Sequence, residues 1–257
     1  ALRILSDTPS HRRALTAQGL VPPLLALLSR EGQDPAVLGA GCRAAAELTR
    51  RCGAPCAQQL SRHGGIPQLA ALAGHSLRPV REGALAALAN LCGQGFVRPS
   101  VGGAGGVALL LAALRREPSS PQARAHLRAL CLCCREAVNR ARVRAGGGLD
   151  LLLALLQLPA HRESHPHILL ALLAYFYDQA ALDYLQARGL VPALLGQLLR
   201  LAGLPRGAAG GAVPPPPPPP PPPRDSREAA SFDYPPERPV PGEEQPNESS
   251  ASFLGLR

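Results

Sequence analysis

The sequence predicts an all-α fold made of stacked helical repeats, that is, a solenoid. Five glycine-led apolar segments begin at Gly19, Gly65, Gly106, Gly148 and Gly189, so they recur every 41 to 46 residues. This period is typical of helical solenoids, in which each repeat buries its apolar face against its neighbours. Apolar residues, mostly the helix formers Leu and Ala, make up 46% of the chain, and aromatic residues make up only 3%.

Each repeat is predicted to contain a short helix, a glycine turn, a Leu-rich helix and a long helix. Apolar residues recur at spacings of three and four in the long helices, which are expected at 36–50, 76–92, 122–135 and 167–178. Between the second and third of these, the short helix is expected at 94–104 and the Leu-rich helix at 105–115. The pair Gly105 and Gly106 is expected to end the short helix, because glycine readily adopts a left-handed turn.

The composition changes near residue 203, where we place the boundary between the solenoid and a Pro-rich tail. Residues 1–203 hold about four and a half repeats of about 42 residues, and residues 204–257 include ten consecutive prolines at 214–223. Such a run favours an extended polyproline II rod, here flanked by disorder. Pro219, Pro222 and Arg224 match an SH3-domain ligand pattern, although a passive spacer would contain the same pattern by chance.

The cysteine pattern predicts an intracellular protein, and the basic charge belongs to the predicted solenoid. The formal charge is +9, all 27 basic residues are Arg, and residues 1–202 carry 22 Arg against 11 acidic residues. The seven cysteines are an odd number, and Cys42, Cys92 and Cys131 occupy apolar helical positions, which is typical of reduced, buried thiols. No uninterrupted apolar run is long enough to cross a membrane. The sequence begins within a helix and contains no Met, so we expect a fragment.

Several segments resemble the armadillo-repeat family. Ala-Leu-Ala-Asn-Leu-Cys at 87–92 and Gly-Gly-Ile-Pro at 64–67 are similar to its consensus. The segments 134–142, 147–152 and 227–233 more closely resemble armadillo-repeat adaptors of cullin-3 ubiquitin ligases. The resemblance implies a right-handed superhelical solenoid that recognises the large subunit of RNA polymerase II, in the cytoplasm and nucleus. It assigns the cullin contact to a BTB domain, which we do not find in this sequence. The alternative is a scaffold resembling the catenins, with no role in degradation.

In armadillo proteins the long helix of each repeat lines a concave groove, where a ladder of Asn side chains can bond the backbone of an extended peptide. Asn90 is predicted to occupy one rung, and Ile4, Glu47, Leu132 and Tyr175 are aligned with it. Arginines surround these rungs, and a basic groove favours acidic or phosphorylated segments. For any single Arg the alternative is a solvated helical face. The predicted groove residues are Arg43, Glu47, Asn90, Arg124, Arg128, Arg135 and Tyr175.

The sequence does not predict an enzyme or a cofactor site. No catalytic triad, phosphate-binding loop or carboxylate pair is recognisable. His161, His165 and His167 lie in a Pro-containing stretch without a fourth zinc ligand, so we interpret them as solvated histidines in a loop. The cluster Arg140, Arg142 and Arg144 precedes a glycine turn, where cations stabilise a helix C-terminus. Nucleic-acid binding would require stacking aromatic residues beside this charge, and the chain has only four Phe and four Tyr.

Overall fold

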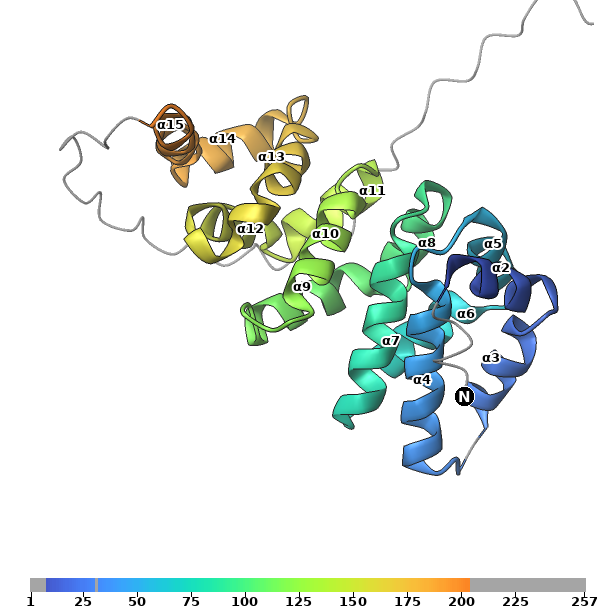
Figure 1. Cartoon of the computed structure of the whole chain (residues 1–257). Helices are drawn as coiled ribbons and strands as arrows, with labels where there is room; N and C mark the ends of the chain where they lie inside the picture. Colours follow the sequence, from blue (N-terminus) through green and yellow to red (C-terminus); the bar gives the residue numbers. More distant parts are fainter. Residues whose placement is uncertain (1–7, 31, 204–257) are drawn as a thin grey trace, which may run out of the picture. The chain divides into compact units, whose positions relative to one another are not determined.

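The computed structural model describes residues 8–30 and 32–203, which form helices and turns and contain no strand. The helices follow one another as short, Leu-rich and long (Figure 1). The first repeat comprises α2 (Pro9–Ala17), α3 (Val21–Ser29) and α4 (Pro35–Thr49), and the second comprises α5 (Ala54–Arg62), α6 (Gly65–Ala73) and α7 (Arg78–Leu91). The third comprises η1 (Gly95–Val97), α8 (Arg98–Gly103), α9 (Gly106–Arg116) and α10 (Ala123–Cys133). The fourth comprises α11 (Ala137–Ala145), α12 (Gly148–Gln157), η2 (Pro159–Ser164) and α13 (His165–Leu173), and α14 (Gln179–Ala187) and α15 (Leu190–Leu201) follow. The predicted all-α repeat architecture is confirmed.

Glycine forms the turn between each short helix and the following Leu-rich helix. The five residues with left-handed φ at this point are Gly19, Gly64, Gly105, Gly147 and Gly189, with φ between +65° and +88°. The residue after Gly105 has a different role. A Cβ on Gly106 would lie 2.5 Å from Cγ1 of Val101 and 2.7 Å from its carbonyl oxygen. The first glycine of the pair therefore allows the turn, and the second allows the two helices to approach closely.

The core is continuous through the repeats and consists mainly of Leu and Ala. The long helices α4 and α7 pack especially closely, because a Cβ on Gly83 of α7 would lie 2.8 Å from the backbone carbon of Cys42 on α4. All seven cysteines are buried, as predicted for Cys42, Cys92 and Cys131. Burial raises the pKa of Cys42 to about 11.

Side-chain amides connect each repeat to the one before it. An Asn or Gln donates to a backbone carbonyl that lies 41 to 44 residues earlier in the chain. We call these bonds the inter-repeat amide contacts. The pairs are Gln59 with Thr16, Gln68 with Leu25, Asn90 with Ala46, Gln94 with Cys52, Asn139 with Arg98 and Gln197 with Leu156, at 2.6 to 3.2 Å. Since an unpaired polar group is costly in a protein interior, each contact favours one alignment of neighbouring repeats.

The fourth long helix is shorter than predicted. We expected residues 167–178, whereas α13 begins at His165 and ends at Leu173. Asp178 instead caps α14, since its Oδ1 accepts a hydrogen bond of 3.1 Å from the backbone amide of Ala181. The Asp178 carboxylate also forms an ion pair of 2.8 Å with Arg144.

Two of the three histidines that we interpreted as solvated are buried. His161 lies in η2, and His165 begins α13. The ring of His165 is within 3.2 Å of both the Gln197 side chain and the Leu158 carbonyl oxygen. The interpretation as a solvated loop was therefore wrong for these two residues, because η2 and α13 place them inside the packed fourth repeat.

The arginines of α11 form hydrogen bonds and an ion pair within the protein. Arg140 donates to the carbonyls of Cys134 and Arg135, which directly follow the preceding long helix α10, at 3.2 and 3.4 Å. Arg142 donates to Asn139 Oδ1 at 3.2 Å, and Arg144 binds Asp178.

The Pro-rich tail predicted for 204–257 lies outside the described residues. The same holds for the SH3-ligand pattern at Pro219, Pro222 and Arg224, and for the segment 227–233. These predictions remain untested.

Candidate protein-binding face

The surface side chains of the long helices and of the turns that end them define the candidate site, which we call the long-helix face. Equivalent positions in α4, α7, α10 and α13 are found by counting back from the next left-handed glycine, because the short helices between them occupy similar lengths. Thr49, Asn90, Leu132 and Ala174 stand at one constant distance in sequence before Gly64, Gly105, Gly147 and Gly189. We therefore treat these four residues as the equivalent positions of the four repeats and call them the rung positions.

Two predicted rung residues are therefore out of register. Glu47 lies two positions before the rung and Tyr175 lies one position after it. Each step along an α-helix turns by about 100°, so such a slip redirects the side chain. Tyr175 is fully buried, and its hydroxyl donates to the Arg140 carbonyl oxygen at 3.1 Å. The prediction that Tyr175 lines the groove was wrong.

Asn90 occupies the expected rung, but its amide faces the preceding repeat. Nδ2 donates to the Ala46 carbonyl oxygen at 3.0 Å and to Thr49 Oγ1 at 3.3 Å. Because an amide nitrogen has two hydrogens, these contacts can occupy both donors. Asn90 then has only its carbonyl oxygen to offer an extended peptide.

A hollow of about 400 Å³ lies between the end of α4, α7 and α10, and we call it the basic hollow. Its polar lining comprises Arg50, Arg51, Asn90, Gln94 and Arg128. Arg50 pairs with Glu47 at 2.7 Å. The exposed guanidinium groups of Arg51 and Arg128, by contrast, have no carboxylate partner among the residues that the structure describes.

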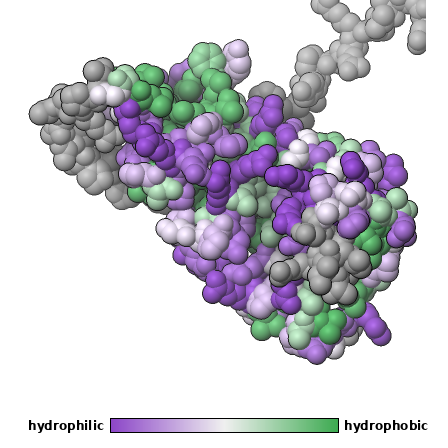
Figure 2. Space-filling model, viewed as in Figure 1, coloured by the Kyte–Doolittle hydropathy of each residue, from purple (hydrophilic) through white to green (hydrophobic). Residues whose placement is uncertain are grey.

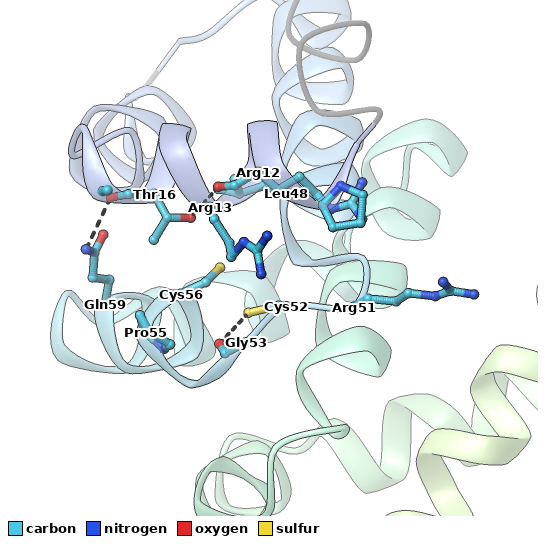
Figure 3. Close-up of a pocket in the computed structure, with 12 residues that line it drawn as sticks. Arg12, Arg13, Thr16, Leu48, Arg51, Cys52, Gly53, Pro55, Cys56 and Gln59 are labelled. Carbon is cyan, nitrogen blue, oxygen red and sulfur yellow. Dashed lines mark hydrogen bonds between the residues drawn. The ribbon is translucent and has the colours of Figure 1, made fainter.

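Arg51 lies at an unusual point of the backbone. Its φ is +53°, which a non-glycine residue rarely adopts. A second hollow, of about 240 Å³, adjoins this turn between α2 and α5 (Figure 3). In that view Arg13 extends towards Cys52 and Cys56, whereas Arg51 points away from them. Arg51 is among the residues that line both the α2–α5 hollow and the basic hollow, so its charge is available to either.

A third hollow, of about 520 Å³, lies between α10 and α13, and we call it the apolar hollow. Leu170, Leu173 and Tyr177 line it and are 65%, 62% and 95% exposed. Arg135, Arg140 and His167 also line it. The hydropathy surface agrees, since hydrophobic side chains gather over α13 (Figure 2).

The predicted groove residues thus divide into three groups. Asn90 and Arg128 line the basic hollow, and Arg135 lines the apolar hollow. Arg43, Glu47 and Arg124 are not among the residues that line either hollow. Arg124 instead forms an exposed ion pair with Glu163, and Tyr175 belongs to the core.

The residues that shape this face and that the prediction missed include Arg51, Arg140, Leu170 and Tyr177. Counting from the glycine turns would have found the two in the fourth repeat. Leu170 stands as far before Gly189 as Arg128 stands before Gly147. Tyr177 and Arg135 correspond in the same way.

The described ranges contain neither a metal-binding group nor a single membrane-spanning helix. Among them, no three His, Cys, Asp or Glu side chains are grouped so that they could hold a metal ion. No single described helix has the length and apolarity to cross a membrane. The segments Gly95–Gly103 and Gly106–Arg116 together have the required length and apolarity, but an 80° bend separates them.

Comparison with known proteins gives the family. The family model described as ARMC5 matches residues 1–194. Armadillo repeat-containing protein 5 from Mus musculus is 48% identical over 197 residues, which are 75% of this chain and 19% of the mouse protein. The chain thus spans about a fifth of the length of that relative.

Solved structures support the same fold. The designed armadillo repeat protein YIII(Dq)4CqI has a TM-score of 0.64 and 21% identity, over 76% of this chain and 83% of its own. A related design in complex with the peptide (KR)4 has a TM-score of 0.58 and 21% identity, over 76% and 82%. The chain therefore belongs to the ARMC5 family of armadillo-repeat proteins, whose repeats form a protein-binding scaffold.

Proposed function

We propose that this chain is the substrate-recognition part of a cullin-3 ubiquitin ligase adaptor. It captures an acidic or phosphorylated extended segment of the large subunit of RNA polymerase II, in the cytoplasm and nucleus. The observation that supports this most is the group of exposed arginines on the long-helix face, Arg51, Arg128 and Arg135, which have no carboxylate partner within the described part of the chain.

The chemistry of these arginines favours anionic ligands. A guanidinium group can donate two parallel hydrogen bonds to one carboxylate or phosphate, and such charge-assisted bonds are stronger than neutral ones. Arg128 lies on α10, and Arg135 lies in the turn that directly follows this helix. Arg128 lines the basic hollow and Arg135 lines the apolar hollow, so together they can hold an anionic segment across the two.

Capture of purified RNA polymerase II by the immobilised 257-residue chain tests the proposal. The wild-type chain is compared with Arg128→Glu/Arg135→Glu and with a matched control, Arg30→Glu/Arg162→Glu. The control removes the same charge from exposed arginines that line neither hollow. Circular dichroism first establishes equal helix content. We expect the wild-type and control chains to capture the polymerase, and the Arg128→Glu/Arg135→Glu chain to lose at least about tenfold in affinity.

One further arm of this experiment identifies the charged groups, and two outcomes would contradict the proposal. Phosphatase treatment of the polymerase tells whether phosphate groups or carboxylates carry the negative charge. Equal capture by all three chains would move the binding site away from the long-helix face. No capture by any chain would contradict the polymerase assignment and favour a scaffold resembling the catenins. Because the resemblance assigns the cullin contact to a BTB domain, cullin-3 binding is tested with a longer protein.

A further inference from the structure

The long-helix face changes its chemistry from one repeat to the next. Arg128 and Arg135 mark two positions of the third repeat, counted back from the left-handed Gly147. The same count from Gly189 gives Leu170 and Tyr177 in the fourth repeat. Equivalent positions in stacked repeats lie side by side on one surface. A pair of cations is thus followed by a pair of large apolar side chains.

The apolar pair is not explained by packing within the described part of the chain. Leu170 and Tyr177 are 65% and 95% exposed, and Leu173 between them is 62% exposed. They line the apolar hollow together and are not scattered singly over the surface. Exposed apolar side chains that gather at a hollow are typical of a surface that binds another molecule.

Charged groups on the rim indicate what kind of molecule fits. Arg135 and Arg140 line the apolar hollow, and none of the described Asp or Glu residues does. Arg140 is fixed there by its bonds to the Cys134 and Arg135 carbonyls. An apolar side chain in this hollow is therefore surrounded by positive charge, which favours a ligand that is acidic elsewhere along its length.

We infer that the long-helix face binds a two-part motif, a pair of acidic residues at Arg128 and Arg135 and a Leu or Phe in the apolar hollow. Packed helices lie about 8 to 10 Å apart, and an extended chain advances about 3.3 to 3.6 Å per residue. The two parts of the motif are therefore about two or three residues apart in the ligand. This inference rests on the proposed function, because it names the sequence pattern that the same face selects.

Fluorescence anisotropy with synthetic peptides tests the motif on the full 257-residue chain. The probes are fluorescein-labelled Gly-Ser peptides of roughly 14 residues, long enough to cross several repeats. Each carries a Glu-Glu pair and then either Leu or Ser, placed about one, three or six residues later. We expect the Leu peptide with the intermediate spacing to bind about tenfold more tightly than its Ser counterpart, since burying one Leu side chain strengthens binding by about this factor.

Protein variants assign each half of the motif to its residues. Leu170→Ser/Tyr177→Ser changes only exposed side chains, so the helix content is expected to stay unchanged. This variant is expected to bind the Leu and Ser peptides equally, at the wild-type affinity for the Ser peptide. Arg128→Glu/Arg135→Glu is expected to weaken the binding of both peptides.

The outcomes distinguish this inference from the proposed function. Equal binding of the Leu and Ser peptides by the wild-type chain would overturn the two-part motif. If Arg128→Glu/Arg135→Glu then still weakened both peptides, the proposed preference for acidic segments would stand. A Leu preference that survives in Leu170→Ser/Tyr177→Ser would also overturn the motif, because it would place the apolar contact elsewhere. No saturable binding of any Glu-containing peptide would contradict both proposals.

Discussion

The amides between the repeats and the arginines on the long-helix face are both polar, but they differ in where their partners lie. Asn90, Gln94 and Asn139 donate to carbonyl oxygens of the preceding repeat within 3.0 Å. Arg128 and Arg135 have no carboxylate partner in the described ranges. A polar group with an internal partner serves stability, whereas a charge without one is available to a ligand.

This difference decides how Asn90 should be interpreted. In an armadillo ladder such an Asn is expected to bond the ligand, yet here its amide joins α7 to α4. We therefore expect Asn90 to contribute less to ligand binding than an Asn of such a ladder would. Stability and binding can then be altered separately, which the following substitutions test.

The largest effect on stability is expected for Asn139→Ala. Asn139 is fully buried, and its Nδ2 lies 2.8 Å from the Arg98 carbonyl oxygen. Truncation removes this bond and leaves a small cavity, so we expect a loss of about 2 kcal/mol in the free energy of unfolding. Urea denaturation measures the loss. Peptide affinity under native conditions is expected to stay unchanged, and a parallel loss of affinity would show that the two kinds of residue are coupled.

Asn90→Ala is expected to have a smaller effect, about 1 kcal/mol, because this side chain is only half-buried. Capture of acidic peptides should persist, since both amide hydrogens already face α4. Binding and denaturation are measured on the same sample. If capture is lost while stability is unchanged, the ladder role predicted from the sequence is correct and our interpretation is wrong.

Arg128→Ala and Arg135→Ala should show the reverse pattern. Both side chains are exposed and unpaired by any described carboxylate, so each change is expected to alter the free energy of unfolding by less than about 0.5 kcal/mol. Affinity for acidic peptides should fall in both variants, most strongly at low ionic strength, where screening is weakest. A salt-independent loss of affinity would contradict an electrostatic role.

His126 on α10 is a buried polar residue whose effect on stability can be tested by changing the pH. Burial lowers the pKa of this histidine, and the nearby Glu82 opposes the shift. The neutral form is thus favoured in the folded state, so stability is retained above the unfolded pKa of about 6.5 and decreases as the pH falls below it. Between roughly pH 8 and 5 the free energy of unfolding should fall less steeply in His126→Gln than in the wild-type chain, as measured by urea denaturation at each pH. The same slope in both proteins would exclude His126 as the source of the pH dependence.

The fold could be predicted from the sequence because its strongest signals are local and repeated. The glycine spacing, the Leu and Ala periodicity and the segment 87–92 each report on the repeat unit. The turn was located to within one residue, since the left-handed positions are Gly64, Gly105 and Gly147.

The site was less predictable because the long helices differ in length. Helix α4 has 15 residues and α13 has 9, so an alignment that runs through the helices slips, as it did at Glu47 and Tyr175. The partners of Arg124 and Asn90 lie in neighbouring repeats, at Glu163 and Ala46. No local pattern reports on contacts of that kind. The basic character of the face was foreseen, and the apolar hollow was not.

The inter-repeat amide contacts also have a mechanical consequence. Each bond spans one repeat boundary, so a force applied at one end of the solenoid would break the bonds of the terminal repeat before those further in. The chain should then extend in steps, each releasing one repeat of 41 to 45 residues. A fully extended segment of this size measures about 140 Å. In a force-extension experiment the repeats would unfold one after another, and the length of the chain would increase in nearly equal steps.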